Sequence, residues 1–344
     1  MERQAILFIL NLLIIFFPGC SNENKIKQLD FKIQEDIECI SIPYQDILGI
    51  TMQLQKKDNL LFLNDFRGDT LIHIYDVRKQ QLLRKMIPVG SGPKELMSPV
   101  EIHVDKEHLF IFYRQTSLMY SIPLDSVMNG NKDMVKNFQV PDGANLLFPI
   151  NDSLFISSGF FEKRYVLFNH SGELIHEFGE YPAYWDREKH LSYRVRAMFH
   201  QTSFEKHPSA PLFLTYSPHV FEIYDYSAGI STPTLVKRMC IGNYNYLYTD
   251  NETMLAVESG MDVEKGIISV SCSSKHIYIL YDYDNAGHEN PVTKIQVIDW
   301  NGNPVKLLNL PKRGTCLHID EEEEIGYMIV EDPDDTLMYF NLGQ

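Results

Sequence analysis

The chain has 344 residues and a formal net charge of −15 at pH 7, because its 46 Asp and Glu residues outnumber its 31 Lys and Arg residues. This acidity argues against binding to nucleic acid, whose phosphates require a surface rich in Lys and Arg. It also argues against attachment to an anionic membrane through a basic patch.

The first predicted element is a signal peptide. A short segment with Arg3 precedes the apolar sequence "AILFILNLLIIFF", and the sequence "PGC" then ends at Cys20. The apolar run is shorter than the roughly 20 residues of a membrane-spanning helix and is typical of a signal-peptide h-region. We therefore predict that residues 1–19 are removed.

The small residue Gly19 directly before Cys20 resembles the lipobox of bacterial lipoproteins. This resemblance implies that Cys20 is acylated and attaches the protein to a lipid bilayer as an outer-membrane lipoprotein of the cell envelope, on the periplasmic or the outer face. Several acyl chains on one Cys give stable anchoring without a spanning helix. Residues 20–28 would form the lipidated tether. The alternative is an ordinary secretory signal with an incidental Cys.

Six repeats follow in residues 29–344. Each begins with an alternating apolar strand, a polar turn and a denser apolar strand, the pattern of a β-hairpin. The repeats start at Met52, Ile102, Phe148, Phe199, Ile268 and Leu317, and the fourth is looser than the others. Units of about 54 residues are close to known blade repeats. We predict an all-β, six-bladed β-propeller with four-stranded antiparallel blades.

The ring of blades requires closure, because no fourth strand follows the last repeat. The run "FKIQEDIECISI" precedes the first repeat and has the alternation of a strand. We predict that this N-terminal run supplies the missing outer strand and closes the ring.

The segment "VGSGPKELMSP", residues 89–99, has the Gly and Lys content of a phosphate-binding loop. Such a loop would lead from a fixed Gly spacing into a helix, but here the strand "VEIHVD" follows. The segment occupies the same place in its repeat as "FGEYPAY" and "IGNYNYL" do in theirs. It is therefore predicted to connect two blades.

This connector resembles the G-x-G-P-G-E-F-x-x-P connector of six-bladed TolB-like and NHL-like propeller lipoproteins, which are common in Bacteroidetes. Lys94 and Leu96 stand where that pattern has Gly and Phe. The resemblance covers residues 29–344 and implies a propeller on an outer-membrane lipoprotein. It implies no particular activity.

Four cysteines lie beyond Cys20, at positions 39, 240, 272 and 316. An even number in an exported chain permits disulfides. However, three of them lie in β-patterned runs, where a buried free Cys behaves as a small hydrophobic residue. Both states remain open from the sequence.

Three histidines are the candidate metal ligands. His103 and His318 occupy equivalent repeat positions, and His200 lies in the corresponding part of the looser repeat. Three His near a channel could hold a divalent ion, which would favour a metal-dependent hydrolase or lyase acting on a carbohydrate or lactone. Gln53, Pro149 and Ser269 stand at the equivalent positions of other repeats, so simple inheritance of the repeat also explains the histidines.

Residues 180–208 lengthen the connection between the third and fourth blades. Tyr, Trp and Arg are enriched at binding hot spots, and this segment concentrates Tyr184, Trp185, Arg187, Tyr193, Arg194 and Arg196. We interpret the protein as a binding or scaffold module for a protein, peptide or glycan partner, with no cofactor and no catalytic residue identified. The alternative for these aromatic residues is that they cover the propeller core.

Overall fold

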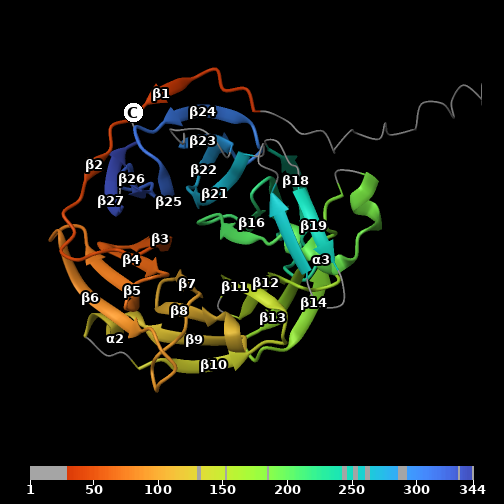
Figure 1. Cartoon of the computed structure of the whole chain (residues 1–344), viewed down its shortest axis with the longest axis horizontal. Helices are drawn as coiled ribbons and strands as arrows, with labels where there is room; N and C mark the ends of the chain where they lie inside the picture. The colour runs from red at the N-terminus through yellow and green to blue at the C-terminus, as the bar shows by residue number, and fades with distance from the viewer. Residues whose placement is uncertain are drawn as a thin grey trace, which may run out of the picture.

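The computed structural model describes residues 29–129, 133–151, 153–183, 186–241, 246–250, 255–259, 264–285, 293–331 and 334–342. These residues form six blade sheets arranged radially around a central axis (Figure 1), and a separate two-stranded sheet. The prediction of an all-β, six-bladed propeller with four-stranded antiparallel blades is confirmed. No helix in the described ranges is long and apolar enough to cross a membrane.

Blades 1 to 4 each consist of four consecutive strands, numbered outward from the channel. Blade 1 contains β3 (Thr51–Lys57), β4 (Leu60–Asp65), β5 (Thr70–Asp76) and β6 (Gln81–Pro88). Blade 2 contains β7 (Val100–Val104), β8 (His108–Tyr113), β9 (Leu118–Pro123) and β10 (Val135–Gln139). Blade 3 contains β11 (Ala144–Asn151), β12 (Leu154–Gly159), β13 (Tyr165–Asn169) and β14 (Leu174–Phe178). Blade 4 contains β15 (Ser203–Lys206), β16 (Leu212–Tyr216), β17 (Val220–Asp225) and β18 (Thr234–Cys240).

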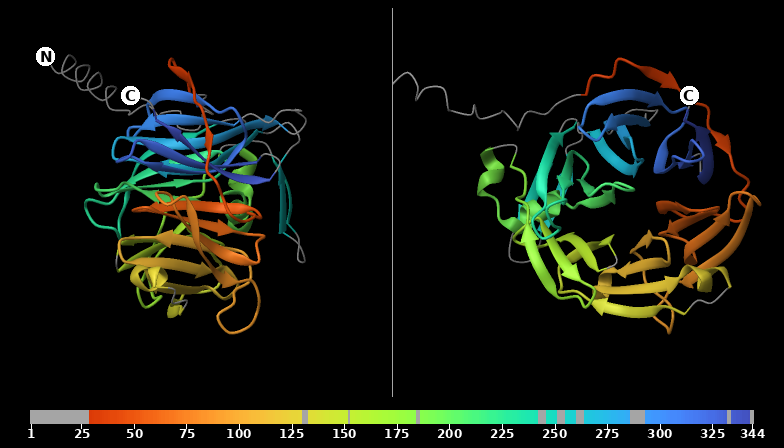
Figure 2. Two further views of the ribbon diagram at one scale, coloured as in Figure 1. Left: turned by 90° about the vertical axis from the view of Figure 1, so that its left-hand side faces the viewer. Right: turned by 180° about the vertical axis from the view of Figure 1, so that it is seen from behind.

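Blades 5 and 6 both recruit N-terminal strands. Blade 5 contains β21 (Glu264–Cys272), β22 (His276–Asn285), β23 (Thr293–Asp299) and β24 (Pro304–Asn309), and β1 (Gln34–Asp36) adds a fifth, parallel strand. Blade 6 contains β25 (Gly314–Asp320), β26 (Ile325–Glu331) and β27 (Asp335–Asn341), with β2 (Ile40–Ser41) antiparallel at its outer edge. The predicted closure by the N-terminal run is therefore confirmed, and Figure 2 shows this run along the outside of the ring.

The remaining elements interrupt the repeat. They are η1 (Arg114–Thr116), α2 (Leu124–Met128), η2 (Asp186–His190), α3 (Tyr193–Phe199), β19 (Tyr246–Asp250) and β20 (Leu255–Ser259). The β19–β20 hairpin lies between blades 4 and 5, and sequence analysis did not identify it. α3 packs against β20, and the ring of Phe199 meets that of Tyr248 edge to face at 6.3 Å between centroids.

The hydrophobic core lies between adjacent blades rather than within one blade. For example, Phe62 and Ile74 of blade 1 pack in one cluster with Ile111 of blade 2. The two middle strands of each sheet are covered on both faces, which explains why their sequences are denser in apolar residues than the alternating inner strands. Cys39, Cys240, Cys272 and Cys316 are free thiols in this structure.

Residues 89–99 connect β6 to β7, as predicted. The carboxylate of Glu95 accepts a hydrogen bond from the Gly92 N–H at 2.9 Å, and a Cβ at Gly90 would collide with the same carboxylate. The loop therefore folds around an internal anion, which explains its glycines without a bound phosphate.

Candidate ligand-binding site in the axial channel

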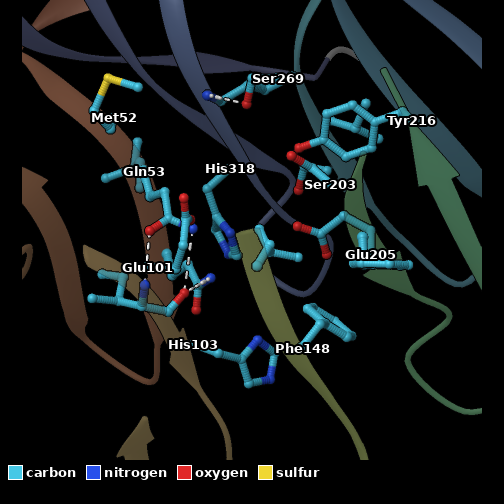
Figure 3. A pocket seen from close by; sticks show the side chains of 18 of the residues that line it. Met52, Gln53, Glu101, His103, Phe148, Ser203, Glu205, Tyr216, Ser269 and His318 are labelled. Carbon is cyan, nitrogen blue, oxygen red and sulfur yellow. Dashed lines mark hydrogen bonds between the residues drawn. The ribbon is translucent and has the colours of Figure 1, made fainter. Parts of the chain in front are cut away.

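The channel wall is made of two rings of side chains from the six inner strands. We define the turn-side ring as the residues at the third pair from the hairpin turn: Gln55, His103, Phe148, Glu205, Ser271 and His318. The connector-side ring, at the fifth pair, consists of Gln53, Glu101, Leu146, Ser203, Ser269 and Cys316. All but Cys316 line one cavity of about 200 Å³ (Figure 3).

These pairings correct the repeat alignment made from the sequence. Gln55 and Ser271, rather than Gln53 and Ser269, occupy the position of His103 and His318. In blade 3 the equivalent residue is Phe148 rather than Pro149, because the ladder shifts register between Pro149 and Asn151. A β-bulge inserts one residue without any strong mark in the sequence.

In blade 1, the ring residues hold the next blade. The Gln55 side chain accepts a hydrogen bond from the Val104 N–H at 2.7 Å and donates one to the Ile102 carbonyl at 3.1 Å. Gln53 accepts from the Ile102 N–H at 2.8 Å. Both amides are used to join blades 1 and 2.

In blade 5, two serines do the same for blade 6. The hydroxyl of Ser269 accepts from the Leu317 N–H at 3.1 Å, and that of Ser271 accepts from the Ile319 N–H at 2.9 Å. These bonds satisfy backbone groups of an inner strand whose channel edge has no neighbouring strand.

In blades 2 and 4, the rings instead carry acids. Glu101 and Glu205 are half-buried, and neither carboxylate has a hydrogen-bond or ion-pair partner among the described residues. Burial raises the pKa of Glu101 to about 7 against the opposing charge of Arg114. Burial also raises the pKa of Glu205 to about 8 against the charge of Lys206. Both carboxyls are thus able to change protonation state near neutral pH.

Tyr216, from β16, shows that the two acids share one environment. Burial is the main cause of its raised pKa, and the charges of Glu205 and Glu101 raise it further. The side chain of Glu205 extends into the opening bounded by the labelled residues in Figure 3. The phenol of Tyr216 stays protonated beside them and is able to donate or accept a hydrogen bond.

Both ring histidines are held neutral. Burial, with a smaller effect of Lys206, lowers the pKa of His103 to about 3, and burial lowers that of His318 to about 4. The His103 ring meets Phe148 of blade 3 edge to face at 4.7 Å between centroids. The Nδ1 atom of His103 is buried and has no hydrogen-bond partner among the described residues.

His200 does not join the other two candidate metal ligands. It follows α3, is buried, and does not line the channel cavity. Burial and then the charges of Arg164 and Arg238 lower its pKa well below the usual value. In the part of the chain that the structure describes, no group of three His, Cys, Asp or Glu side chains could hold a metal ion. The position expected for His200 in the channel is occupied by Glu205.

The predicted partner-binding residues divide into two sets. Tyr184 and Trp185 lie outside the described residues, as does the side chain of Arg187. Tyr193 and Arg194 are exposed on α3. Arg196 turns inward, where its guanidinium lies 5.8 Å from the centroid of the buried Tyr181 ring. Of the three predicted side chains that the structure describes, two are exposed.

Sequence analysis missed Glu101, Glu205 and Tyr216. One signal was available: when the repeats are aligned from their hairpin turns, Glu stands at two ring positions where blades 1 and 5 have Gln or Ser. Tyr216 had no such signal, because it belongs to a second strand and reaches the channel only in the folded structure.

The fold and the channel define this chain as a six-bladed propeller protein. The sequence model described as "TolB-like 6-blade propeller-like" matches residues 32–322, so the chain belongs to this family. No curated protein matches its sequence.

Two solved structures from Bacteroides share the fold. A protein described as exported, from Bacteroides fragilis NCTC 9343, aligns with a TM-score of 0.57 at 11% identity, over 90% of this chain and 98% of its own. A DUF4221 family member from Bacteroides vulgatus ATCC 8482 aligns with a TM-score of 0.54 at 10% identity, over 89% and 98%. At these identities the likeness concerns the fold.

Proposed function

We propose that this protein is an exported binding protein that holds a small ligand in its axial channel. One observation carries the proposal: Glu101 and Glu205 line a single cavity, and neither carboxylate has a hydrogen-bond or ion-pair partner among the described residues. Convergent polar groups in a concave site are the usual mark of a ligand pocket. The wall of the site is rigid, because Gln55 and Ser271 fix neighbouring inner strands.

Native mass spectrometry of the protein purified from its own cells tests whether a small molecule is bound. We expect a bound small molecule in the wild-type protein and its absence after Ser203→Phe, which would fill the channel. Circular dichroism and a melting curve check that this variant folds. A wild-type protein without ligand, which also binds nothing in a screen, contradicts the proposal.

If the protein converts the bound compound into a product, it is an enzyme rather than a binding protein. The alternative is a metal-dependent hydrolase or lyase using His103, His200 and His318, and elemental analysis of the purified protein tests it. We expect no stoichiometric divalent ion, because His200 lies away from the cavity that the other two residues line.

We further propose that Cys20 is acylated and tethers the propeller to the outer membrane. The support comes from the sequence around Cys20, which lies outside the described residues. Cys20→Ala should move the protein from the membrane fraction to the soluble fraction after cell lysis. An unchanged membrane fraction contradicts the tether.

The exposed face of α3 is the place where we propose that a protein, peptide or glycan partner docks. Tyr193 is 37% exposed and Arg194 is exposed, whereas Val195 and Phe199 are buried in the propeller body. A double substitution of Tyr193 and Arg194 by Ala should abolish capture of that partner in a pull-down and leave the melting temperature unchanged. Equal capture by the variant contradicts this docking face.

A further inference from the structure

We propose that the channel ligand is an organic dication, such as a diamine or polyamine, whose ammonium groups are bound by Glu101 and Glu205. This inference rests on the proposed function and names the chemical class of its ligand. It follows from the arrangement of the acids, from the residues around them and from the dimensions of the cavity.

The two acids are the first reason for a cation. A carboxylate withdrawn from water is costly unless a counter-charge or several hydrogen bonds compensate it. Neither Glu101 nor Glu205 has such a partner among the described residues. The amine of Lys206 contacts the carbonyls of Pro149 at 3.3 Å and Ile150 at 3.4 Å instead. Arg114 and Lys206 lower the pKa values of the two acids through their charges but form no ion pair with them, and a positively charged ligand would supply that direct pair.

The separation of the acids favours an extended molecule over a metal ion. Glu101 belongs to blade 2 and the connector-side ring, whereas Glu205 belongs to blade 4 and the turn-side ring. Calcium needs six to eight converging oxygen ligands, and the described residues offer no such metal-binding group. Two ammonium groups joined by a short chain are able to reach both acids.

The other side chains around the cavity suit a cation as well. His103 and His318 are neutral, so they add no repulsion. The rings of Phe148 and Tyr216 line the cavity. Aromatic faces attract cations, and the Lys206 amine lies 5.9 Å from the centroid of the Phe148 ring. The net charge of −15 draws cations toward the whole molecule.

The cavity volume limits the ligand to a slender molecule. The space of about 200 Å³ is smaller than the 300 to 1,000 Å³ of pockets for drug-sized ligands. An aliphatic chain with an amine at each end is slender enough for this space.

The charged and titratable groups near the acids predict how binding depends on pH. Glu101 faces Arg114 and Tyr216, and Glu205 faces Lys206, Tyr216 and Cys272. Burial raises the pKa values of both acids toward neutrality, so both become more ionised between pH 6 and pH 8.5. An aliphatic amine stays protonated over this range. Binding should therefore tighten as the pH rises.

Isothermal titration calorimetry of the purified protein with cadaverine and spermidine tests this inference. At pH 8.5 we expect cadaverine to bind at least tenfold more tightly than the monoamine pentylamine, and at least tenfold more tightly than at pH 6. Glu101→Gln and Glu205→Gln should each weaken cadaverine binding tenfold or more. Glu162→Gln, at an exposed acid outside the channel, should leave it unchanged. Equal binding by all variants, or no binding of either amine, overturns the inference.

Further probes separate this inference from the proposed function. Calcium chloride, the neutral sugar cellobiose and the dicarboxylate adipate are titrated into the wild-type protein and the Ser203→Phe variant. If cellobiose or adipate binds and Ser203→Phe abolishes the binding, the channel is a binding site but the cationic class is wrong. If calcium binds and excludes cadaverine, a metal ion replaces the dication. If no probe binds and the protein from its own cells carries no ligand, both proposals fail.

Discussion

Equivalent positions of the repeat have different roles in two pairs of blades, the pair formed by blades 1 and 5 and the pair formed by blades 2 and 4. In blades 1 and 5, Gln55 and Ser271 bond the backbone of the next blade. In blades 2 and 4, the equivalent His103 and Glu205 make no such bond and face the cavity. The difference shows that one position in a repeat either stabilises the ring or remains available to a ligand, depending on the side chain and on the neighbouring blade.

The neighbouring blade matters because of one proline. Gln55 and Ser271 both accept from an N–H at the second pair of the next inner strand, from Val104 and Ile319. In blade 3 that second-pair residue is Pro149, which has no N–H to donate. His103 therefore packs on Phe148 instead, and its Nδ1 remains without a described partner.

The largest expected effect tests what holds blades 3 and 4 together besides the Lys206 amine, which bonds the Pro149 and Ile150 carbonyls of the neighbouring inner strand. Deeper in these blades, Arg164 donates to Glu222 at 2.8 Å, and both side chains are fully buried. Arg164→Met should destabilise the protein by about 3 kcal/mol, because it leaves a buried charge without one of its partners. Urea unfolding measures the loss. Lys163→Met, in an exposed pair with Glu180, is the control and should cost far less, because solvent screens an exposed ion pair. Equal losses would show that the buried pair is not what joins these blades.

The next effect compares the equivalent positions of blades 1 and 2 directly. Gln55→Leu should cost about 2 kcal/mol, because the Val104 N–H and Ile102 carbonyl lose a partner. His103→Leu, at the equivalent position, should cost less than about 0.5 kcal/mol, because no hydrogen bond is lost there. Urea unfolding of both variants checks the comparison. Similar costs would mean that the residue at this position stabilises the ring equally in blades 1 and 2.

The acid Glu205 of blade 4 should make the free energy of unfolding depend on pH. The pKa of Glu205 is raised to about 8 in the folded chain, whereas an unfolded Glu titrates near 4.3. The folded state therefore holds this proton more tightly, and its stability falls as the pH rises from that of the unfolded pKa to about 8 and then levels off. Glu205→Gln should remove this loss, which is roughly 2 to 3 kcal/mol between pH 6 and pH 9 at about 1.4 kcal/mol per pH unit below pH 8. Unfolding at the two pH values tests this, with Glu162→Gln as a control. A wild-type stability that does not fall toward pH 9 contradicts it.

The smallest effect concerns the serines of blade 5. Ser271→Ala removes one acceptor for the Ile319 N–H, and water in the channel is able to replace it in part. We expect a loss of about 0.5 to 1 kcal/mol. Thermal and urea unfolding measure it against Ser209→Ala, on the exposed loop after β15. A loss as large as that of Gln55→Leu would show that a single bond and a pair of bonds contribute alike.

The sequence by itself determined the architecture of this protein. Successive residues of a strand point to opposite faces, so the pattern of apolar residues shows which faces are buried. The sequence repeats an alternating inner strand followed by a densely apolar middle strand six times, and this predicts six blades. The N-terminal run pairs with the last blade as predicted, through Ile40 opposite Tyr339. The connector at residues 89–99 was also recognised from its place in the repeat.

Only the tertiary structure decided which side chains share the channel. Glu101 and Glu205 lie in blades 2 and 4, with blade 3 between them in sequence, and line the same cavity only when the ring closes. The bulge in β11 moved the register of blade 3, and His200 proved to lie outside the channel position that Glu205 occupies. The local sequence pattern determines which face of a strand is buried. Bulges, turn lengths and the neighbouring blade determine which residues that face contacts. Those contacts join residues that are distant in the chain, so the local pattern does not predict them.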